Sequence, residues 1–128
     1  MIYIDSSVAL AYLLVEPRAP SEAFWDAALV SSRLLQYEVW NRLHAYGFGQ
    51  SRRDEATTLL GRPELIDLTQ SVLALALEPL PIVVRTLDAL HLATVEFLRA
   101  QGETVELASY DNRLVAAARA LGITIAAL

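Results

Sequence analysis

Three aspartates of this chain occupy the starts of predicted helices. Asp5 and Asp111 each follow a short apolar run and precede a helix, and Asp88 lies in the first turn of a third helix. Each position alone is typical of helix capping, where a carboxylate accepts backbone N–H groups and complements the helix dipole by ~0.3–1 kcal/mol. Taken together they suggest more, because strand-to-helix junctions of a parallel sheet share one edge, where ligands bind.

Carboxylates gathered at such an edge predict a metal site. Neighbouring carboxylates repel and raise one another's pKa, so a cluster of them is costly unless a cation is bound. Oxygen donors suit Mg²⁺ or Mn²⁺ better than zinc. We therefore expect Mg²⁺ or Mn²⁺ to be the cofactor.

Glu38 is a fourth candidate for this site. It lies on a helix predicted over residues 32–46, with Leu34 and Leu35 one turn earlier, so it projects from a largely apolar side. An i,i+4 ion pair with Arg42, in the favourable Glu-before-Arg order, explains the position equally well. The pattern leaves both interpretations open.

The other chemistry-bearing side chains favour packing roles. His91 follows Asp88 by three residues, on the same helical face, and is expected to be a hydrogen-bonded packing residue more than a metal ligand. Trp25, Trp40 and Tyr46 are predicted to lie in the core. For Tyr110, packing is favoured over stacking on a nucleic-acid base.

Composition excludes several other chemistries. All ten basic residues are Arg, so mechanisms that need a lysine amine are excluded, and the absence of Cys excludes disulfides and cysteine-ligated metals. A chain of 128 residues predicts one domain, 1–128. The longest apolar run, residues 8–15, is far below the ~20 residues of a membrane span. With no secretory signal visible, we expect a cytoplasmic protein without membrane contact.

The elements that must position these residues alternate between short strands and helices. This alternation predicts an α/β fold, with a parallel sheet covered by helices on both faces. Strands are expected at residues 1–4, 29–31, 65–68, 105–109 and 123–125. Helices are expected at residues 6–15, 21–29, 32–46, 53–60, 70–77, 86–100 and 112–121.

The segments around the four acids resemble the motifs of PIN domains. Residues 4–10 (IDSSVAL) resemble the first motif, and residues 32–39 (SRLLQYEV) the second. Residues 85–93 (RTLDALHLA) and 108–114 (ASYDNRL) match the third and fourth. The match spans the chain in order, and the subgroup it resembles most is the VapC-type toxin, the ribonuclease of a toxin–antitoxin pair.

The resemblance implies a fold and an activity. The fold is a three-layer α/β/α sandwich with a parallel sheet of about five strands, and the activity is metal-dependent endoribonuclease. Asp5, Glu38, Asp88 and Asp111 then form the acidic quartet that holds Mg²⁺ or Mn²⁺. Water activated by such an ion would hydrolyse a phosphodiester to 5′-phosphate and 3′-hydroxyl ends without a Lys, Cys or His nucleophile.

The same motifs assign supporting residues. Ser6 or Ser7, together with Ser109, falls where hydroxyls support the acids. Arg113 stands where some PIN domains carry a further Asp, which leaves a four-carboxylate site. Arg85 and Arg113 lie beside site residues and are candidate contacts to RNA phosphate, which Arg binds bidentately.

A VapC-like protein is also expected to have protein partners. The resemblance implies a homodimer and inhibition by a cognate antitoxin, with the apolar partner surface expected around Phe24, Trp25, Trp40 and Tyr46. The serious alternative is a catalytically silent PIN-like module that only binds. Phosphatases and receiver domains that also begin with a strand and an Asp need a lysine, which the chain lacks.

Overall fold

The computed structural model describes residues 1–128, whose five strands form one parallel sheet. Its order is β3-β2-β1-β4-β5, which puts β1 at the centre. The strands are β1 (Ile2–Ile4), β2 (Leu29–Ser32), β3 (Glu64–Ile66), β4 (Glu106–Ala108) and β5 (Thr124–Ile125). The predicted strands are therefore confirmed, with ends that differ by a few residues.

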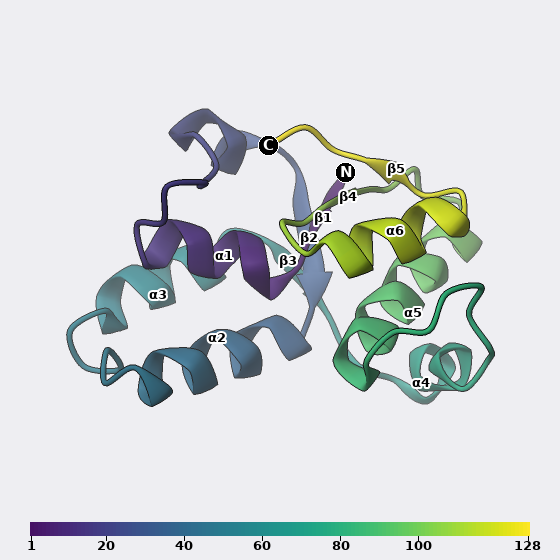
Figure 1. Cartoon of the computed structure of the whole chain (residues 1–128), viewed down its shortest axis with the longest axis horizontal. Helices are drawn as coiled ribbons and strands as arrows, with labels where there is room; N and C mark the ends of the chain where they lie inside the picture. Colours follow the sequence, from purple (N-terminus) through teal and green to yellow (C-terminus); the bar gives the residue numbers. More distant parts are fainter.

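Helices cover both faces of the sheet (Figure 1). One face carries α1 (Ser6–Leu13), α2 (Leu34–Ala45) and α3 (Arg53–Leu60). The other carries α5 (Thr86–Ala100) and α6 (Asn112–Ala120), with α4 (Gln70–Ala76) packed on α5. This is the three-layer α/β/α sandwich that the sequence predicts.

Two apolar cores hold the layers together because successive strand side chains point to opposite faces. In β1, Ile4 packs in the core beneath α1–α3, whereas Tyr3 packs in the core beneath α5 and α6. Leu29 and Val30 divide in the same way on β2. Strands buried on both faces must be apolar at consecutive positions, which explains their short unbroken apolar runs.

The helix predicted over residues 21–29 is wrong. The segment forms a single 3₁₀ turn, η1 (Glu22–Asp26), and the backbone is already extended at Ala27 on its way into β2. Trp25 is the one buried residue of the turn, 4% exposed, and contacts the rings of Tyr12 and Phe24 edge-on. Because the backbone is extended at Ala27 and β2 begins at Leu29, no further helical turn fits between η1 and the strand.

Two expectations about α2 and the aromatic residues also need correction. The helix begins at Leu34 because Ser32 still belongs to β2, and the Ser32 hydroxyl accepts the Leu34 N–H at 3.1 Å. Tyr46 follows the last turn of α2 and is 54% exposed, so it lies outside the core. Conversely, buried Trp25 cannot belong to a partner surface.

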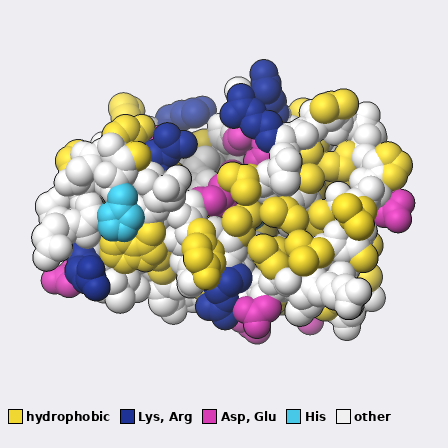
Figure 2. Space-filling view, turned by 90° about the horizontal axis from the view of Figure 1, so that it is seen from below, with side chains coloured by type: hydrophobic (Ala, Val, Ile, Leu, Met, Phe, Trp, Pro, Cys, Tyr) yellow, Lys and Arg dark blue, Asp and Glu magenta, His cyan; other side chains and the backbone are white.

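The parallel strands place their carboxyl ends at one edge of the sheet. Figure 2 views this edge and shows acidic side chains in a hollow, with a broad apolar area over α4 and α5 beside it.

None of the helices combines the length and apolar character needed to cross a bilayer.

Candidate active site

All four predicted acids line one pocket of about 530 Å³ at this edge. Asp5 directly follows β1, Asp111 ends the loop after β4, Glu38 lies on α2 and Asp88 on α5. Because β1 and β4 are neighbours in the sheet, the loops after them meet, as expected for residues at strand-to-helix junctions.

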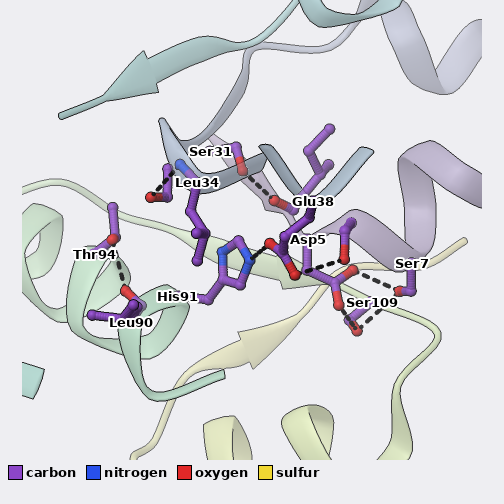
Figure 3. Close-up of polar contacts among 12 residues, drawn as sticks. Asp5, Ser7, Ser31, Leu34, Glu38, Leu90, His91, Thr94 and Ser109 are labelled. Carbon is purple, nitrogen blue, oxygen red and sulfur yellow. Dashed lines mark hydrogen bonds and ion pairs between the residues drawn. The ribbon is translucent and has the colours of Figure 1, made fainter. Parts of the chain in front are cut away.

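Asp5 is held by two hydroxyls. Ser7 Oγ donates to Oδ1 at 2.6 Å and Ser109 Oγ donates to Oδ2 at 2.9 Å, so α1 and the end of β4 both contribute (Figure 3). The carboxylate is 4% exposed, and its burial raises the pKa of Asp5 while the hydroxyls and His91 act in the opposite direction. It makes no capping bond to α1 although it occupies the N-cap position, so capping does not explain Asp5.

Asp111 combines capping with a place in the pocket. Its Oδ1 accepts the backbone N–H of Arg113 at 2.9 Å and that of Leu114 at 3.3 Å, which caps α6. The carboxylate is therefore fixed in orientation by the helix that it starts, while it lines the same pocket as the other acids.

Asp88 lies in the first turn of α5 and is influenced by its acidic neighbours. Partial burial raises the pKa of Asp88, followed by the negative charge of Asp111, while His91 and Arg85 act in the opposite direction. The pocket as a whole is lined by four carboxylates but only two arginines, Arg42 and Arg85, so its formal charge is negative.

Glu38 has its hydrogen-bond partners on other helices and not on α2. It forms no ion pair with Arg42, so that interpretation is wrong; instead Ser6 Oγ donates to Oε2 at 3.1 Å. His91 Nε2 lies 2.5 Å from Oε1 (Figure 3). The pairing with His91 joins α2 and α5, which cover opposite faces of the sheet.

His91 continues this contact into the core, where its Nδ1 lies 2.7 Å from the Tyr3 hydroxyl. A carboxylate only accepts, so a neutral His91 carries its proton on Nε2 and accepts the Tyr3 hydroxyl at Nδ1. His91 is 1% exposed, which confirms the predicted hydrogen-bonded packing residue. The part played by Tyr3 was missed; its only sequence signal is a hydroxyl within an apolar strand.

The two candidate phosphate contacts differ in position. Arg85 lines the acidic pocket, next to the start of α5. Arg113, the second residue of α6, is exposed and does not line it. Arg42 does line the pocket, although the sequence suggested it only as a partner of Glu38.

Comparison with known proteins identifies the family. The PIN domain family model matches residues 2–120, which is nearly the whole chain. The chain belongs to the PIN domain family.

Relatives of this PIN domain are similar over their full lengths. Ribonuclease VapC46 of Mycobacterium tuberculosis is 34% identical over 129 residues, which cover 98% of this chain and 96% of the relative. Ribonuclease VapC47 of the same species is 32% identical over 136 residues, with the same coverage. Ribonuclease VapC35 is 28% identical over 133 residues, covering 99% and 96%.

The side chains that line the acidic pocket of this PIN domain are of the chemical type that binds a hard divalent cation. Four carboxylates line one pocket, and none of them forms an ion pair with an Arg. Carboxylate oxygens are the ligands that Mg²⁺ and Mn²⁺ prefer. No three Asp, Glu or His side chains are arranged closely enough in the structure to hold an ion together. An ion held by three or more of these groups would require the carboxylates to move toward one another, whereas one or two carboxylates could hold it together with water.

Proposed function

We propose that this PIN domain is a metal-dependent endoribonuclease, the toxin of a toxin–antitoxin pair, and that it hydrolyses RNA phosphodiester bonds. The observation that carries the proposal is the pocket at the carboxyl edge, where one acid from each of four separated segments lines the same space. Full-length similarity to proteins named ribonucleases supports the same activity.

Asp5, Glu38, Asp88 and Asp111 would hold the cation. Bound Mg²⁺ or Mn²⁺ supplies a lowered pKa for an attacking water and neutralises charge on the phosphoryl oxygens. The raised pKa values of Asp5 and Asp88 support this role, because a bound cation would stabilise the ionised carboxylates that burial and repulsion disfavour.

Hydroxyl and imidazole groups orient two of the four carboxylates. Ser7 and Ser109 donate to Asp5, and Ser6 and His91 contact Glu38. Hydrogen bonds to an ionised carboxylate favour its charged form, which is the form that binds cations.

Arginines at the pocket would bind the substrate. Arg85 and Arg42 line the same space as the acids, and a guanidinium matches the geometry of a phosphate with two parallel hydrogen bonds. Arg113 would reach RNA only outside this pocket. Hydrolysis by water would leave 5′-phosphate and 3′-hydroxyl ends.

An RNA-cleavage assay with Mg²⁺ tests the proposal. Wild type should cleave single-stranded RNA, Asp5→Asn should not, and Asp26→Asn, an exposed Asp of η1, should cleave like wild type. Isothermal titration with Mn²⁺ separates the alternative, a catalytically silent binding module. If the wild type shows no RNA cleavage and no heat of Mn²⁺ binding, the silent binding module is favoured instead.

The proposed toxin would bind a cognate antitoxin and form a homodimer. Of the aromatic residues expected to form the partner surface, Tyr46 is exposed while Trp40 and Phe24 are half-buried, so the surface would centre on the end of α2. Light scattering of the purified chain measures the oligomeric state, and a monomer at micromolar concentration would contradict the dimer.

A further inference from the structure

A second pocket, of about 370 Å³, adjoins the acidic pocket and is not explained by metal binding. The two share Ser7, Leu10, Arg42 and Asp111 along their common border. Beyond this border the second pocket is lined by Leu14, Glu16, Arg18, Tyr46 and Tyr110. It therefore offers a different chemistry directly beside the acids.

The distinctive feature of this second pocket is two Arg–Tyr pairs. The guanidinium carbon of Arg18, in the loop after α1, lies 5.1 Å from the ring centroid of Tyr110, in the loop after β4. Arg42 of α2 lies 6.0 Å from the ring of Tyr46, which follows that helix. Both distances are typical of cation–π contacts. We call these four residues the Arg–Tyr subsite.

The groups of the Arg–Tyr subsite remain available to a ligand. Neither guanidinium forms an ion pair with a carboxylate, and both arginines are exposed. Tyr46 is largely exposed and Tyr110 is half-buried. The rings and guanidinium groups therefore keep exposed surface that no other part of this chain covers.

We propose that the Arg–Tyr subsite binds the nucleotide of single-stranded RNA that neighbours the cleaved phosphate. This inference rests on the proposed ribonuclease activity and extends it to how the substrate is held. Unpaired bases stack on aromatic rings and guanidinium planes, and arginine also contacts the phosphate. A pocket of this volume accommodates a small ligand, and its shared border with the acids puts that ligand next to the reacting bond.

The charges of the second pocket favour stacking over phosphate attraction alone. Glu16 and Asp111 line it together with Arg18 and Arg42, so its formal charges balance. A surface that binds nucleic acid by charge alone would carry an excess of positive groups. The subsite should therefore depend more on its rings than on overall ionic attraction.

The groove on the other side of the acidic pocket has a different composition. It is lined by α4, the segment before α5 and the start of α5, with mainly apolar residues and no charged or aromatic side chain (Figure 2). Such a groove offers no aromatic ring or guanidinium for a base to stack on and no cationic side chain for a phosphate; its only polar side chains are Gln70 and Thr86. The substrate strand should therefore extend toward the Arg–Tyr subsite.

Binding of a fluorescein-labelled single-stranded RNA, followed by anisotropy in EDTA so that no cleavage occurs, tests this proposal. Tyr110→Leu and Tyr46→Leu should each weaken binding about 10-fold, the scale of one lost base stack. Tyr110→Phe keeps the ring and should bind like wild type. Tyr37→Leu is the matched control, because Tyr37 is an exposed tyrosine of α2 that lines neither pocket.

The outcomes separate this proposal from the proposed activity. Mn²⁺ titration and the thermal melt of each variant should match wild type, which shows that the acids and the fold are intact. Unchanged RNA affinity in both leucine variants would overturn the subsite, even if the wild type cleaves RNA and Asp5→Asn does not. Weakened self-association or antitoxin binding with unchanged RNA affinity would assign the surface to a protein partner and overturn it as well. A wild type that binds RNA through these tyrosines without cleaving it would contradict only the activity.

Discussion

His91 contacts Glu38 directly, with Nε2 of the imidazole 2.5 Å from Oε1 of the carboxylate. The contact is made at the edge of the sheet between α2 and α5, whose cores lie on opposite faces. It continues through Nδ1 to the hydroxyl of Tyr3, a fully buried residue of the central strand. The orientation of an acid in the pocket is thus determined by packing inside the protein.

Replacing His91 should weaken metal binding in the acidic pocket. His91→Ala removes the group that orients Glu38, and losing such an outer partner typically costs ~10–100-fold in metal affinity. Isothermal titration with Mn²⁺ measures this loss. His91→Gln should restore part of the affinity, because an amide can still donate to Glu38. His44→Ala, at an exposed histidine stacked on Trp40, is the control. If His91→Ala and His91→Gln bind Mn²⁺ as tightly as His44→Ala does, His91 does not position Glu38.

Asp5→Asn should stabilise the metal-free protein at neutral pH, although the proposed mechanism predicts that it abolishes RNA cleavage. Burial raises the pKa of Asp5, so the folded state binds this proton more tightly than the unfolded state. The stability linked to Asp5 is therefore complete below the unfolded pKa of ~3.9 and is lost as pH rises through the folded pKa. Asn cannot ionise and escapes this loss.

Thermal melts in EDTA check the sign. The melting temperature of Asp5→Asn should exceed that of wild type at pH 7, and the difference should shrink toward pH 4. Asp26→Asn should show no such pH-dependent difference. A variant that is less stable than wild type at pH 7 would show that the ionised carboxylate contributes more through its hydroxyl partners than its burial costs.

The positions of the acids, and the serine hydroxyls that donate to Asp5 and Glu38, could be predicted from the sequence motifs, but the histidine partner of Glu38 could not. Asp5 and Asp111 follow strands that the sequence indicates, and parallel pairing of β1 with β4 is enough to bring them together. The contact of Glu38 with His91 was not predictable, because His91 lies 53 residues away along the chain. Helical periodicity shows which side of a helix is apolar, whereas the order of strands in the sheet decides which other helix that side meets.

Ser109→Ala should destabilise the protein at neutral pH. The Ser109 hydroxyl donates to Asp5 Oδ2 and accepts the backbone N–H of Asp111 at 3.0 Å, so it connects two of the acids. Hydrogen bonds to charged groups contribute about 1.5–3 kcal/mol, and losing this one should raise the pKa of Asp5 further. Urea unfolding at pH 7 measures the loss, with Ser51→Ala in an exposed turn as the control. A loss that does not diminish toward pH 4 would indicate that the hydroxyl acts only through packing.

Adding Mn²⁺ should raise the melting temperature of the wild type and remove much of its dependence on pH. A ligand that binds only the folded state stabilises it by ~2.7 kcal/mol at 100 times its dissociation constant. A bound cation also favours ionised carboxylates, so it opposes the burial and the Asp111 charge that raise the pKa of Asp88. Asp88→Asn should lose most of the Mn²⁺-dependent shift, while Asp26→Asn should retain it. If millimolar Mn²⁺ leaves the wild-type melt unchanged, the four acids do not form a metal site, and their common pocket needs another explanation.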